Sequence, residues 1–482
     1  MNTLLDFPLD ILIVIFELLF VQDLSALSQT SRSFLTLVNE FGWAAYLRKN
    51  PRPSLSLCKS RNSSSAKRNV MYDVLTDKSW SQFDFIARPL APPWPGKEQP
   101  ILAMNSSRLV IAAGNTLYSY VFGVSTSNEA PSIAPEGSCP LNNRGYITAL
   151  TCIPDGGLDQ TFCVGLHDGT SEHIVISPRK QHGVPTLSVH GLPDQPPFVA
   201  TNDPIESLTS SGTSLLSLSA SGRAILTDTQ TSRSPSTIEL GTRSWVSHLN
   251  TQSSSPFAVF GSSSKTRPLT VHAITHDHLS PLPTASLEQA EPARRGSAVY
   301  GICKGPPSLW GSSPEIIVSG WYDGTISIHD LRSPSRGCAS DNSSPAPAPL
   351  RPVLTLMNQW SIEPIYSVAS GGGTGCYIAA GWGRHSLVSL WDVRFPSQGL
   401  SIHAPSNDPS PVYSLILESS RLFGVTQSRP FVFDFGPGVT ENTYPSLPAS
   451  PRSRSKRDDI DGLGYYVTSY LHAAPSRLTV VS

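Results

Sequence analysis

The sequence predicts a small all-α domain at the N-terminus followed by a large all-β domain built from repeated units. Three observations support this fold class. Apolar residues recur at helical spacing over residues 7–43. After residue 50, regular helix formers are scarce while proline and serine abound, which is typical of short strands joined by loops. From about residue 100, a weak three-strand motif returns at intervals of about 35 to 65 residues.

Composition sets limits on the partners and the compartment. Charged residues make up 15% of the 482 residues and the net charge is −1, so we expect no nucleic-acid or membrane partner. The seven cysteines are scattered without a CxxC pair, and acidic side chains interrupt the apolar run near the N-terminus. We therefore expect no signal peptide or membrane span, and reduced thiols in the cytoplasm or nucleus.

The N-terminal helical region divides into three short amphipathic segments. In the first, Ile11, Ile15 and Leu19 recur at helical spacing after Pro8, which suits the first turn of a helix. The second follows Asp23, whose carboxylate suits the positive end of a helix. A unit of this size buries too little apolar surface to be stable alone. We therefore expect a partner to cover the apolar side chains that the unit leaves exposed.

The order of short motifs in this region resembles the F-box family. The matching segments are Phe7–Leu12, Asp23–Leu27, Ser31–Phe34 and the final Trp43, with Phe7 and Asp10 in place of the usual Leu and Glu. The resemblance implies docking onto the Skp-type adaptor of a cullin–RING ubiquitin ligase, while the rest of the chain selects the substrate. The predicted adaptor-binding residues, some of which must instead hold the helices together, are Pro8, Ile11, Leu12, Ile15, Leu19, Leu24 and Leu27.

Two domain boundaries follow from composition. We assign residues 1–50 to the F-box, 51–79 to a basic, serine-rich linker and 80–482 to the repeat domain. The basic residues within 48–68 favour a solvated linker over a nucleic-acid-binding arm, because no aromatic residues interleave to stack on bases. Residues 80–87 alternate like a strand and mark the return of folded structure.

Seven repeat units can be aligned in the second part of the chain. Each contains two apolar strands around a tight turn, as at Asp323-Gly324. The units cover residues 109–123, 162–177, 215–229, 257–274, 316–331, 377–393 and 422–435. Several follow a shared strand-opening phrase, at residues 204–208, 299–302, 364–368 and 411–415.

This pattern resembles the WD-repeat family. Trp391-Asp392 matches its signature dipeptide and His329-Asp330 is a degenerate copy, whereas the usual Gly-His dipeptide is missing from every unit. The pattern predicts a β-propeller of about seven blades, because a four-stranded blade cannot bury both faces alone. A β-sandwich array is the rival, and it requires two separate domains.

Two features of the predicted propeller concern its loops and its closure. The Pro/Ser-rich inserts at 124–143, 178–200, 276–296, 333–352 and 437–457 are interpreted as long disordered surface loops. Basic residues in the last insert also fit a nuclear signal, although a solvated loop is favoured. The ring closes either through a C-terminal strand, at 464–470 or 478–481, or through residues 80–87.

No motif in the sequence predicts catalysis. There is no phosphate-binding loop, nucleophile elbow or metal-spaced His/Cys cluster, so we expect no enzyme activity, metal or cofactor.

The predicted function is the substrate-recognition subunit of a cullin–RING ligase with a Skp-type adaptor. Two alternatives stay open. One is a receptor for a different cullin ligase, through the Trp-Asp-x-Arg-like segments 329–332 and 391–394. The other is a propeller scaffold without ubiquitin transfer.

The candidate substrate site lies beside the turns between the second and third strands. Trp321 and Trp382 share one aligned position with Leu166, immediately before the turn. Large aromatic and basic residues together are typical of binding hot spots. The full candidate set is His167, Arg223, Trp321, Tyr322, Trp382, Arg384 and His385. In the alternative interpretation, the two tryptophans pack between blades and only stabilise the fold.

Overall fold

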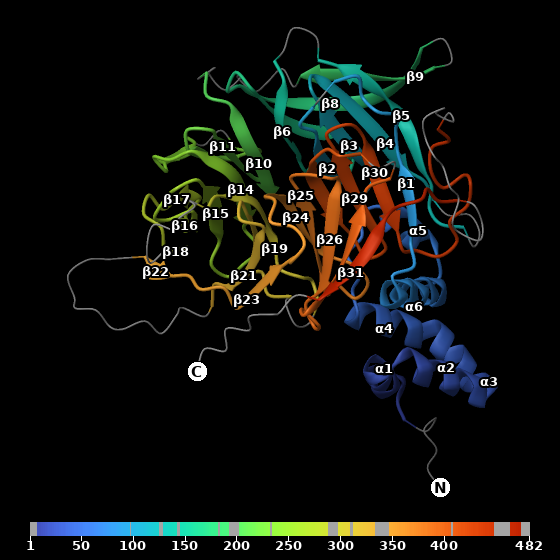
Figure 1. The fold of residues 1–482 in the computed structure, drawn as a ribbon. Helices are drawn as coiled ribbons and strands as arrows, with labels where there is room; N and C mark the ends of the chain where they lie inside the picture. Colours follow the sequence, from blue (N-terminus) through green and yellow to red (C-terminus); the bar gives the residue numbers. More distant parts are fainter. Residues whose placement is uncertain are drawn as a thin grey trace, which may run out of the picture.

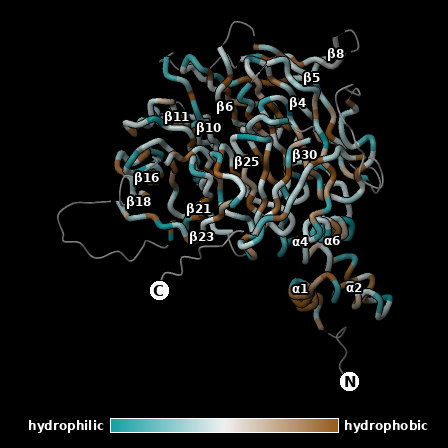
Figure 2. Tube along the Cα trace, in the orientation of Figure 1, coloured by the Kyte–Doolittle hydropathy of each residue, from teal (hydrophilic) through white to brown (hydrophobic). Residues whose placement is uncertain are grey.

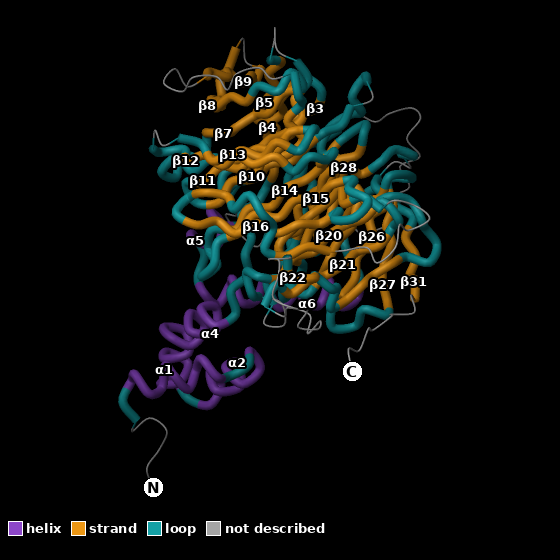
Figure 3. Tube along the Cα trace, turned by 90° about the vertical axis from the view of Figure 1, so that its left-hand side faces the viewer, coloured by secondary structure: helices purple, strands orange, loops and turns teal. Residues whose placement is uncertain are grey.

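A computed structural model describes most of the chain (Figure 1). The described residues are 7–96, 98–124, 129–141, 145–181, 184–191, 202–231, 234–287, 297–308, 312–332, 347–405, 408–447 and 463–473. Helices lie at the N-terminal end and strands make up the remainder, as Figure 3 shows from a second direction. The predicted fold class, a small helical domain followed by an all-β propeller, is confirmed.

The helical part contains six α-helices and one π-helical turn among the described residues. They are α1 (Leu9–Leu18), α2 (Val21–Thr30), α3 (Arg32–Leu37), the π-helical turn Val38–Gly42, α4 (Trp43–Lys49), α5 (Cys58–Ser63) and α6 (Ala66–Gln82). Local polar contacts define their starts. Asp23 accepts a hydrogen bond from the Phe20 backbone N–H at 3.2 Å, and the Ser31 hydroxyl accepts one from Phe34 N–H.

The β part consists of seven sheets, here called blades 1 to 7, in which all strand pairs are antiparallel except the parallel pair β18–β22. Blade 1 contains β2 (Ile101–Met104), β3 (Arg108–Ala113), β4 (Thr116–Phe122) and β5 (Ile133–Pro140). Blade 2 contains β6 (Ile147–Cys152), β7 (Thr161–Leu166), β8 (Ser171–Gln181) and β9 (Val184–Gly191). Blade 3 contains β10 (Ile205–Ser211), β11 (Ser214–Ser219), β12 (Arg223–Asp228) and β13 (Ser236–Glu239). Blade 4 contains β14 (Ser244–Asn250), β15 (Phe257–Ser262), β16 (Leu269–Thr275) and β18 (Ala285–Leu287), with β17 (His278–Leu279) and β22 (Ala348–Pro349) added.

The last three blades follow the same plan. Blade 5 contains β19 (Val299–Lys304), β20 (Ile316–Trp321), β21 (Thr325–Asp330) and β23 (Leu354–Met357). Blade 6 contains β24 (Ile365–Gly371), β25 (Tyr377–Trp382), β26 (Leu387–Asp392), β27 (Gln398–His403) and β31 (Ser469–Ala473). Blade 7 contains β28 (Val412–Leu417), β29 (Arg421–Thr426), β30 (Pro430–Asp434) and β1 (Ile86–Pro89). The first strands of the seven blades contact one another in a closed ring, so the fold is a seven-bladed β-propeller.

The seven aligned sequence units correspond one to one to these blades. Each unit covers the second and third strands of a blade, from β3–β4 in blade 1 to β29–β30 in blade 7. The shared opening phrases fall on the innermost strands β10, β19, β24 and β28. These parts are detectable because the second strands are buried on both faces and therefore read as continuous apolar runs.

An N-terminal strand closes the ring. β1 pairs with β30 in the register Ile86↔Asp434 to Pro89↔Phe431, and so supplies the outer strand of blade 7. The C-terminal strand β31 instead adds a fifth strand to blade 6, where it pairs with β27. Blade 7 therefore combines β1, from the start of the propeller sequence, with β28, β29 and β30 from near its end.

Two sequence predictions about residues 51–87 require correction. Residues 80–82 belong to helix α6, and only 86–89 form a strand. The alternation was misleading because the side chains at 80–87 belong to two elements, separated by the left-handed turn at Phe83 (φ 52°). The predicted linker contains helices α5 and α6, and Trp80 is fully buried.

The Pro/Ser-rich inserts are also more structured than predicted. Strands β5, β9, β17, β18 and β22 lie within them, and their remaining residues lie largely outside the described part of the chain. Most of these are outer strands, which bury one row of side chains at most. β5, for example, has polar or small residues along most of its length and buries only Ile133 fully. Such strands do not show the apolar pattern used to predict strands.

Candidate functional site

The F-box helices surround a small core. Leu12, Phe16, Leu24, Val38 and Trp43 are buried in it. Gly42 lets the π-helical turn approach α2, because a Cβ at this position would lie 3.2 Å from the Leu24 side chain. Outside the core, Glu17 of α1 and Arg48 of α4 form an exposed ion pair at 3.1 Å. Helix α1 therefore packs against the other F-box helices through one face, which carries Leu12 and Phe16.

Helix α1 is also apolar on its opposite face. Ile11, Val14 and Leu18 recur three and four residues apart and are exposed, Val14 by 57% and Leu18 by 67%. Figure 2 shows α1 as a strongly hydrophobic helix at the edge of the molecule. Together with adjacent exposed side chains, these residues form what we call the α1 outer face: Phe7, Leu9, Ile11, Val14, Leu18 and Phe20.

The predicted adaptor-binding residues fall into three groups. Ile11 belongs to the α1 outer face and Pro8 is exposed beside it, so both are accessible to a partner. Leu12 and Leu24 are buried in the F-box core, so they hold the helices together and do not form a surface. Ile15, Leu19 and Leu27 are partly buried against that core. Sequence reasoning did not select the exposed Val14, Leu18 and Phe20, because periodicity cannot show which side is covered in a helix that is apolar over most of its surface.

Helix α6 connects the F-box to the propeller. Near its start, Val70 belongs to the buried F-box core. Near its end, the Trp80 indole stacks between Phe435 and Tyr377, with ring centroids 3.7 and 4.4 Å away, and donates a hydrogen bond to the Ser419 carbonyl at 2.9 Å. Because one helix contributes to both cores, the F-box and the propeller are held as a unit.

A buried carboxylate strengthens this junction. Glu418, in the turn between β28 and β29, accepts hydrogen bonds from the backbone N–H groups of Leu55 and Ser56 and from the hydroxyls of Ser54 and Ser56. Burial raises the pKa of the Glu418 carboxyl, and these donors partly oppose the rise. The segment before α5 is therefore fixed to the face of the propeller formed by the turns after the innermost strands.

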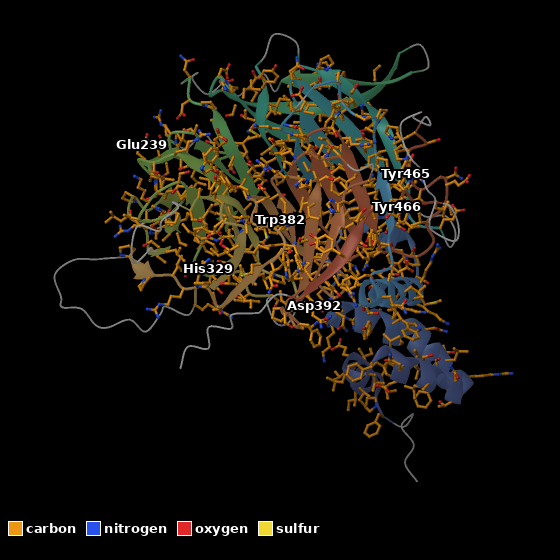
Figure 4. All side chains as sticks on the ribbon, in the orientation of Figure 1. Glu239, His329, Trp382, Asp392, Tyr465 and Tyr466 are labelled. Carbon is orange, nitrogen blue, oxygen red and sulfur yellow. The ribbon has the colours of Figure 1, made fainter. Side chains whose placement is uncertain are left out.

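The two tryptophans of the candidate substrate site are buried. Trp382, labelled in Figure 4, has no exposed surface and donates its indole N–H to Ser389 at 2.9 Å. Trp321 donates its indole N–H to Ser319 at 3.0 Å. The structure therefore corrects the prediction that these side chains contact a substrate. They pack between blades, because every residue of a second strand faces a neighbouring strand or blade.

The other candidate residues are exposed but do not form one cluster. Tyr322 and Arg384 both lie near Tyr366, and Arg384 pairs with Glu363 at 3.5 Å. His167 and Arg223 are exposed on blades 2 and 3, where Arg223 pairs with Glu239 at 3.4 Å. His385 is exposed in the turn after β25 and has a positive φ of 62°. The structure brings together only the candidates of blades 5 and 6.

Four aromatic residues that sequence reasoning did not select lie beside this pair. Trp245, Tyr300, Tyr366 and Tyr413 are partly exposed near the start of four consecutive innermost strands. Their rings contact one another in sequence, at centroid distances of 4.9, 5.6 and 5.6 Å. The signal that could have found three of them is the repeated tyrosine in the strand-opening phrases.

The Trp-Asp-x-Arg-like segments form local ion pairs. Arg332 binds Asp330 through two nitrogens, at 2.9 and 2.7 Å, and Arg394 binds Asp392 in the same way. In blade 5, the imidazole of His329 is within 3.2 Å of the Ser319 hydroxyl, whereas the buried Trp391 N–H in blade 6 has no hydrogen-bond partner among the described residues. The structural tetrad of WD repeats is therefore incomplete, and WD-repeat identity stays a prediction.

The described residues contain neither a metal-binding cluster nor a membrane-spanning helix. No group of three or more His, Cys, Asp or Glu side chains there is placed to hold a metal ion. No helix in the same part of the chain is long and apolar enough to cross a membrane.

Comparison with known proteins identifies the helical part. A model of the F-box domain family matches residues 4–42, which include α1 to α3 and the π-helical turn. A search of curated proteins finds no match to the chain. F-box domains generally bind Skp-type adaptors, and proteins that join an F-box to a propeller are typically non-catalytic adaptors. The chain is therefore an F-box protein whose C-terminal part is a seven-bladed β-propeller.

Proposed function

We propose that this protein is the substrate-recognition subunit of a cullin–RING ubiquitin ligase, with the F-box bound to the Skp-type adaptor and the propeller bound to the substrate. The observation that carries the proposal is the α1 outer face. Its exposed aliphatic and aromatic side chains lie inside the segment that matches the F-box family. Burying a side chain such as Leu18 in an interface contributes about 1.5–3 kcal/mol, so several together support a stable complex.

Helix α6 fixes the orientation of the propeller relative to the F-box, which suits this function. A ligase must hold a lysine of the substrate near the charged conjugating enzyme, and tethering converts that encounter into an intramolecular one. A flexible linker would spread the tethered substrate over many positions. α6, with Val70 in one core and Trp80 in the other, instead restricts the orientation of the propeller relative to the adaptor.

The alternative cullin receptor has less support. Its candidate arginines, Arg332 and Arg394, are already bound to Asp330 and Asp392, so a partner would have to compete with these ion pairs. The α1 outer face is not paired in this way.

Capture of purified Skp-type adaptor by the full chain tests the proposal. The variant Val14→Asp/Leu18→Asp should reduce capture at least about tenfold, because it places two carboxylates in an apolar interface. Leu282→Asp is the matched control, because Leu282 is similarly exposed (63%) but lies in a propeller loop. Equal capture by all three proteins, with equal melting temperatures, would refute the assignment of the α1 outer face.

Ubiquitin transfer separates a ligase subunit from a scaffold. The complete ligase is assembled on the wild-type chain or on the Val14→Asp/Leu18→Asp variant, and transfer of labelled ubiquitin to proteins held by the propeller is followed. A ligase subunit supports transfer only with the intact α1 outer face. A scaffold binds the adaptor but supports no transfer in either form.

A further inference from the structure

The innermost strands carry a repeated irregularity at one end. In six of the seven blades, the pairing of the innermost strand with its neighbour shifts around its first residues. Each shift is a β-bulge, which re-aims the side chain of the extra residue. The bulged residues are Thr148, Glu206, Trp245, Tyr300, Tyr366 and Tyr413.

Four of these residues, in consecutive blades 4 to 7, are aromatic. Trp245 and Tyr300 meet edge to face, as do Tyr300 and Tyr366, whereas Tyr366 and Tyr413 stack nearly parallel at 6°. Tyr322 joins the row at 6.0 Å from Tyr300 and is 46% exposed. We call these five residues the aromatic arc.

The arc lies at the end of the propeller remote from the F-box. Tyr366 is the second residue of β24, and the turn that follows the same strand packs on Trp80, where a Cβ at Gly372 would lie 2.9 Å from the indole. A strand of this length separates the two ends by about 20 Å. A ligand on the arc and an adaptor on α1 therefore bind without mutual obstruction.

Exposed apolar residues extend the arc. Trp360 (74% exposed) and Ile362 (76%) lie on the loop between β23 and β24, which leads into Tyr366. This loop borders the turn after Tyr322, because a Cβ at Gly324 would lie 3.1 Å from the Glu363 carbonyl oxygen. An uncovered tryptophan and isoleucine beside a row of tyrosines have the composition of a binding hot spot.

The two arginines beside the arc are each paired with a carboxylate. The Arg243 guanidinium stacks on Trp245 at 4.1 Å and binds Glu206 at 2.7 Å. Arg384 pairs with Glu363 at 3.5 Å. A phosphorylated segment would need free arginines, and here each bordering arginine already has a carboxylate beside it that repels phosphate. A cationic ligand would find the face of Trp245 occupied by Arg243. The surroundings therefore favour an uncharged ligand.

Extended proline-rich peptides have the matching chemistry. Proline rings pack on aromatic faces, and the carbonyl oxygens of a polyproline II helix make no internal hydrogen bonds, so they accept from tyrosine or tryptophan donors. Burial raises the pKa of Tyr300 and Tyr366, and neighbouring tyrosine hydroxyls, that of Tyr322 among them, add to the rise. The three hydroxyls therefore lie close together and form one group of donors. The two 5.6 Å steps from Tyr300 to Tyr413 span at most about 11 Å, comparable with the roughly 9 Å of one polyproline II turn.

We propose that the aromatic arc binds an uncharged, proline-rich extended segment of the substrate. This inference rests on the proposed function, because it names the class of segment that the propeller would recognise. The bulges place the aromatic side chains, the paired charges exclude phosphate recognition, and Trp360 and Ile362 extend the contact beyond the arc.

An array of short synthetic peptides tests the inference with the full chain bound to its adaptor. One set carries a proline at every third position between varied uncharged residues. A second set has each proline replaced by alanine, and a third adds phosphoserine to the second. We expect the proline set to bind at least about tenfold more strongly than either other set, the size of effect expected when hot-spot contacts are lost.

Variants locate the binding surface. Tyr322→Ala and Tyr366→Phe should each weaken binding of the proline set, the first by removing a ring and the second by removing a donor. Tyr466→Ala is the matched control, because Tyr466 (44% exposed) lies outside the arc on the segment before β31 (Figure 4). It should bind the proline set as the wild type does.

Three results would overturn the inference: equal binding of the first two sets, preference for phosphoserine, or equal losses in Tyr322→Ala and Tyr466→Ala. The chain itself contains a proline-rich segment at residues 345–352. If the arc bound a peptide of this segment and no other proline-rich peptide, the assignment of the ligand to a substrate would be overturned. Adaptor capture, measured on the same preparations, stays normal in all these variants if the proposed function holds. Loss of peptide binding is therefore distinguishable from failure of the F-box.

Discussion

The F-box and the propeller expose apolar side chains for different reasons. The F-box core is small and even includes Val70 from outside the matched segment, so α1 exposes a whole apolar face that its own domain does not cover. The propeller closes on itself, and four of the five arc aromatics protrude from bulges on its innermost strands, outside the buried cores of the blades. The α1 outer face is thus apolar surface that the F-box core does not cover. The aromatic arc, in contrast, consists of side chains that lie outside the core of a closed propeller. The first suits a permanent partner, and the second suits exchangeable segments.

The largest expected effect contrasts a buried aromatic residue with an exposed one. Trp382→Ala removes a fully buried indole and its hydrogen bond to Ser389, which should lower the free energy of unfolding by about 3–5 kcal/mol. Tyr322→Ala should lower it by less than about 1 kcal/mol, because half of the side chain is already in solvent. Urea denaturation of both variants measures the difference. Similar losses would show that the arc belongs to the core.

A second comparison uses pH. Burial lowers the pKa of His329 to about 4, so the unfolded chain binds a proton there below about pH 6.5 while the folded chain does not. The contribution of the neutral His329 to the free energy of unfolding is therefore fully present above about pH 6.5. As pH falls toward 4, the free energy of unfolding decreases by roughly 3 kcal/mol on account of this residue. The variant His329→Gln should show a shallower loss of unfolding free energy over this range. An unchanged slope would contradict the assignment, because His248 and His472 titrate in both proteins.

The junction should respond more weakly than either core. Glu418→Ala leaves buried donors of Leu55 and Ser56 without their acceptor, which costs roughly 1–3 kcal/mol. Because the loss is local, limited proteolysis near residues 48–58 should accelerate more than unfolding of the propeller. Glu441→Ala, at an exposed glutamate, is the control. Equal cleavage of both variants would show that Glu418 does not fix this segment.

Deleting residues 1–50 should have the smallest effect on the propeller. The remaining chain keeps Trp80 and the closing strand β1, so we expect a folded protein with a cooperative transition near that of the full chain. Val70 becomes exposed, which modestly raises the tendency of α6 to associate. Aggregation of the 51–482 chain would show instead that the F-box is integral to the blades. This domain boundary stays a prediction.

Much of the architecture could be predicted from residue patterns, and the failures share a cause. The second and third strands of all seven blades were visible mainly because second strands such as β3 and β29 are buried on both faces, which imposes continuous apolar runs. Outer strands such as β5 and β9 were missed because they are polar or partly solvent-facing. Helix α6 was missed because its mixed surface contacts two domains, and no single stripe of apolar residues marks it.

The sites were harder to predict than the fold. Helical spacing located α1 but could not separate Leu12, which is buried, from Val14, which is exposed, because the helix is apolar over most of its surface. In the propeller, large aromatics next to a turn looked like a surface, yet Trp382 is inside. The arc depends on bulges, which change the direction of a side chain without changing its place in the sequence pattern.

Hydrogen–deuterium exchange of the full chain, with and without purified Skp-type adaptor, tests the central claim most directly. The account predicts that adaptor binding slows exchange in α1 and α2 and leaves the segments around Tyr366 and Asp392–Arg394 unchanged. New protection at Asp330–Arg332 or Asp392–Arg394, with none in α1, would contradict it and favour docking through the propeller.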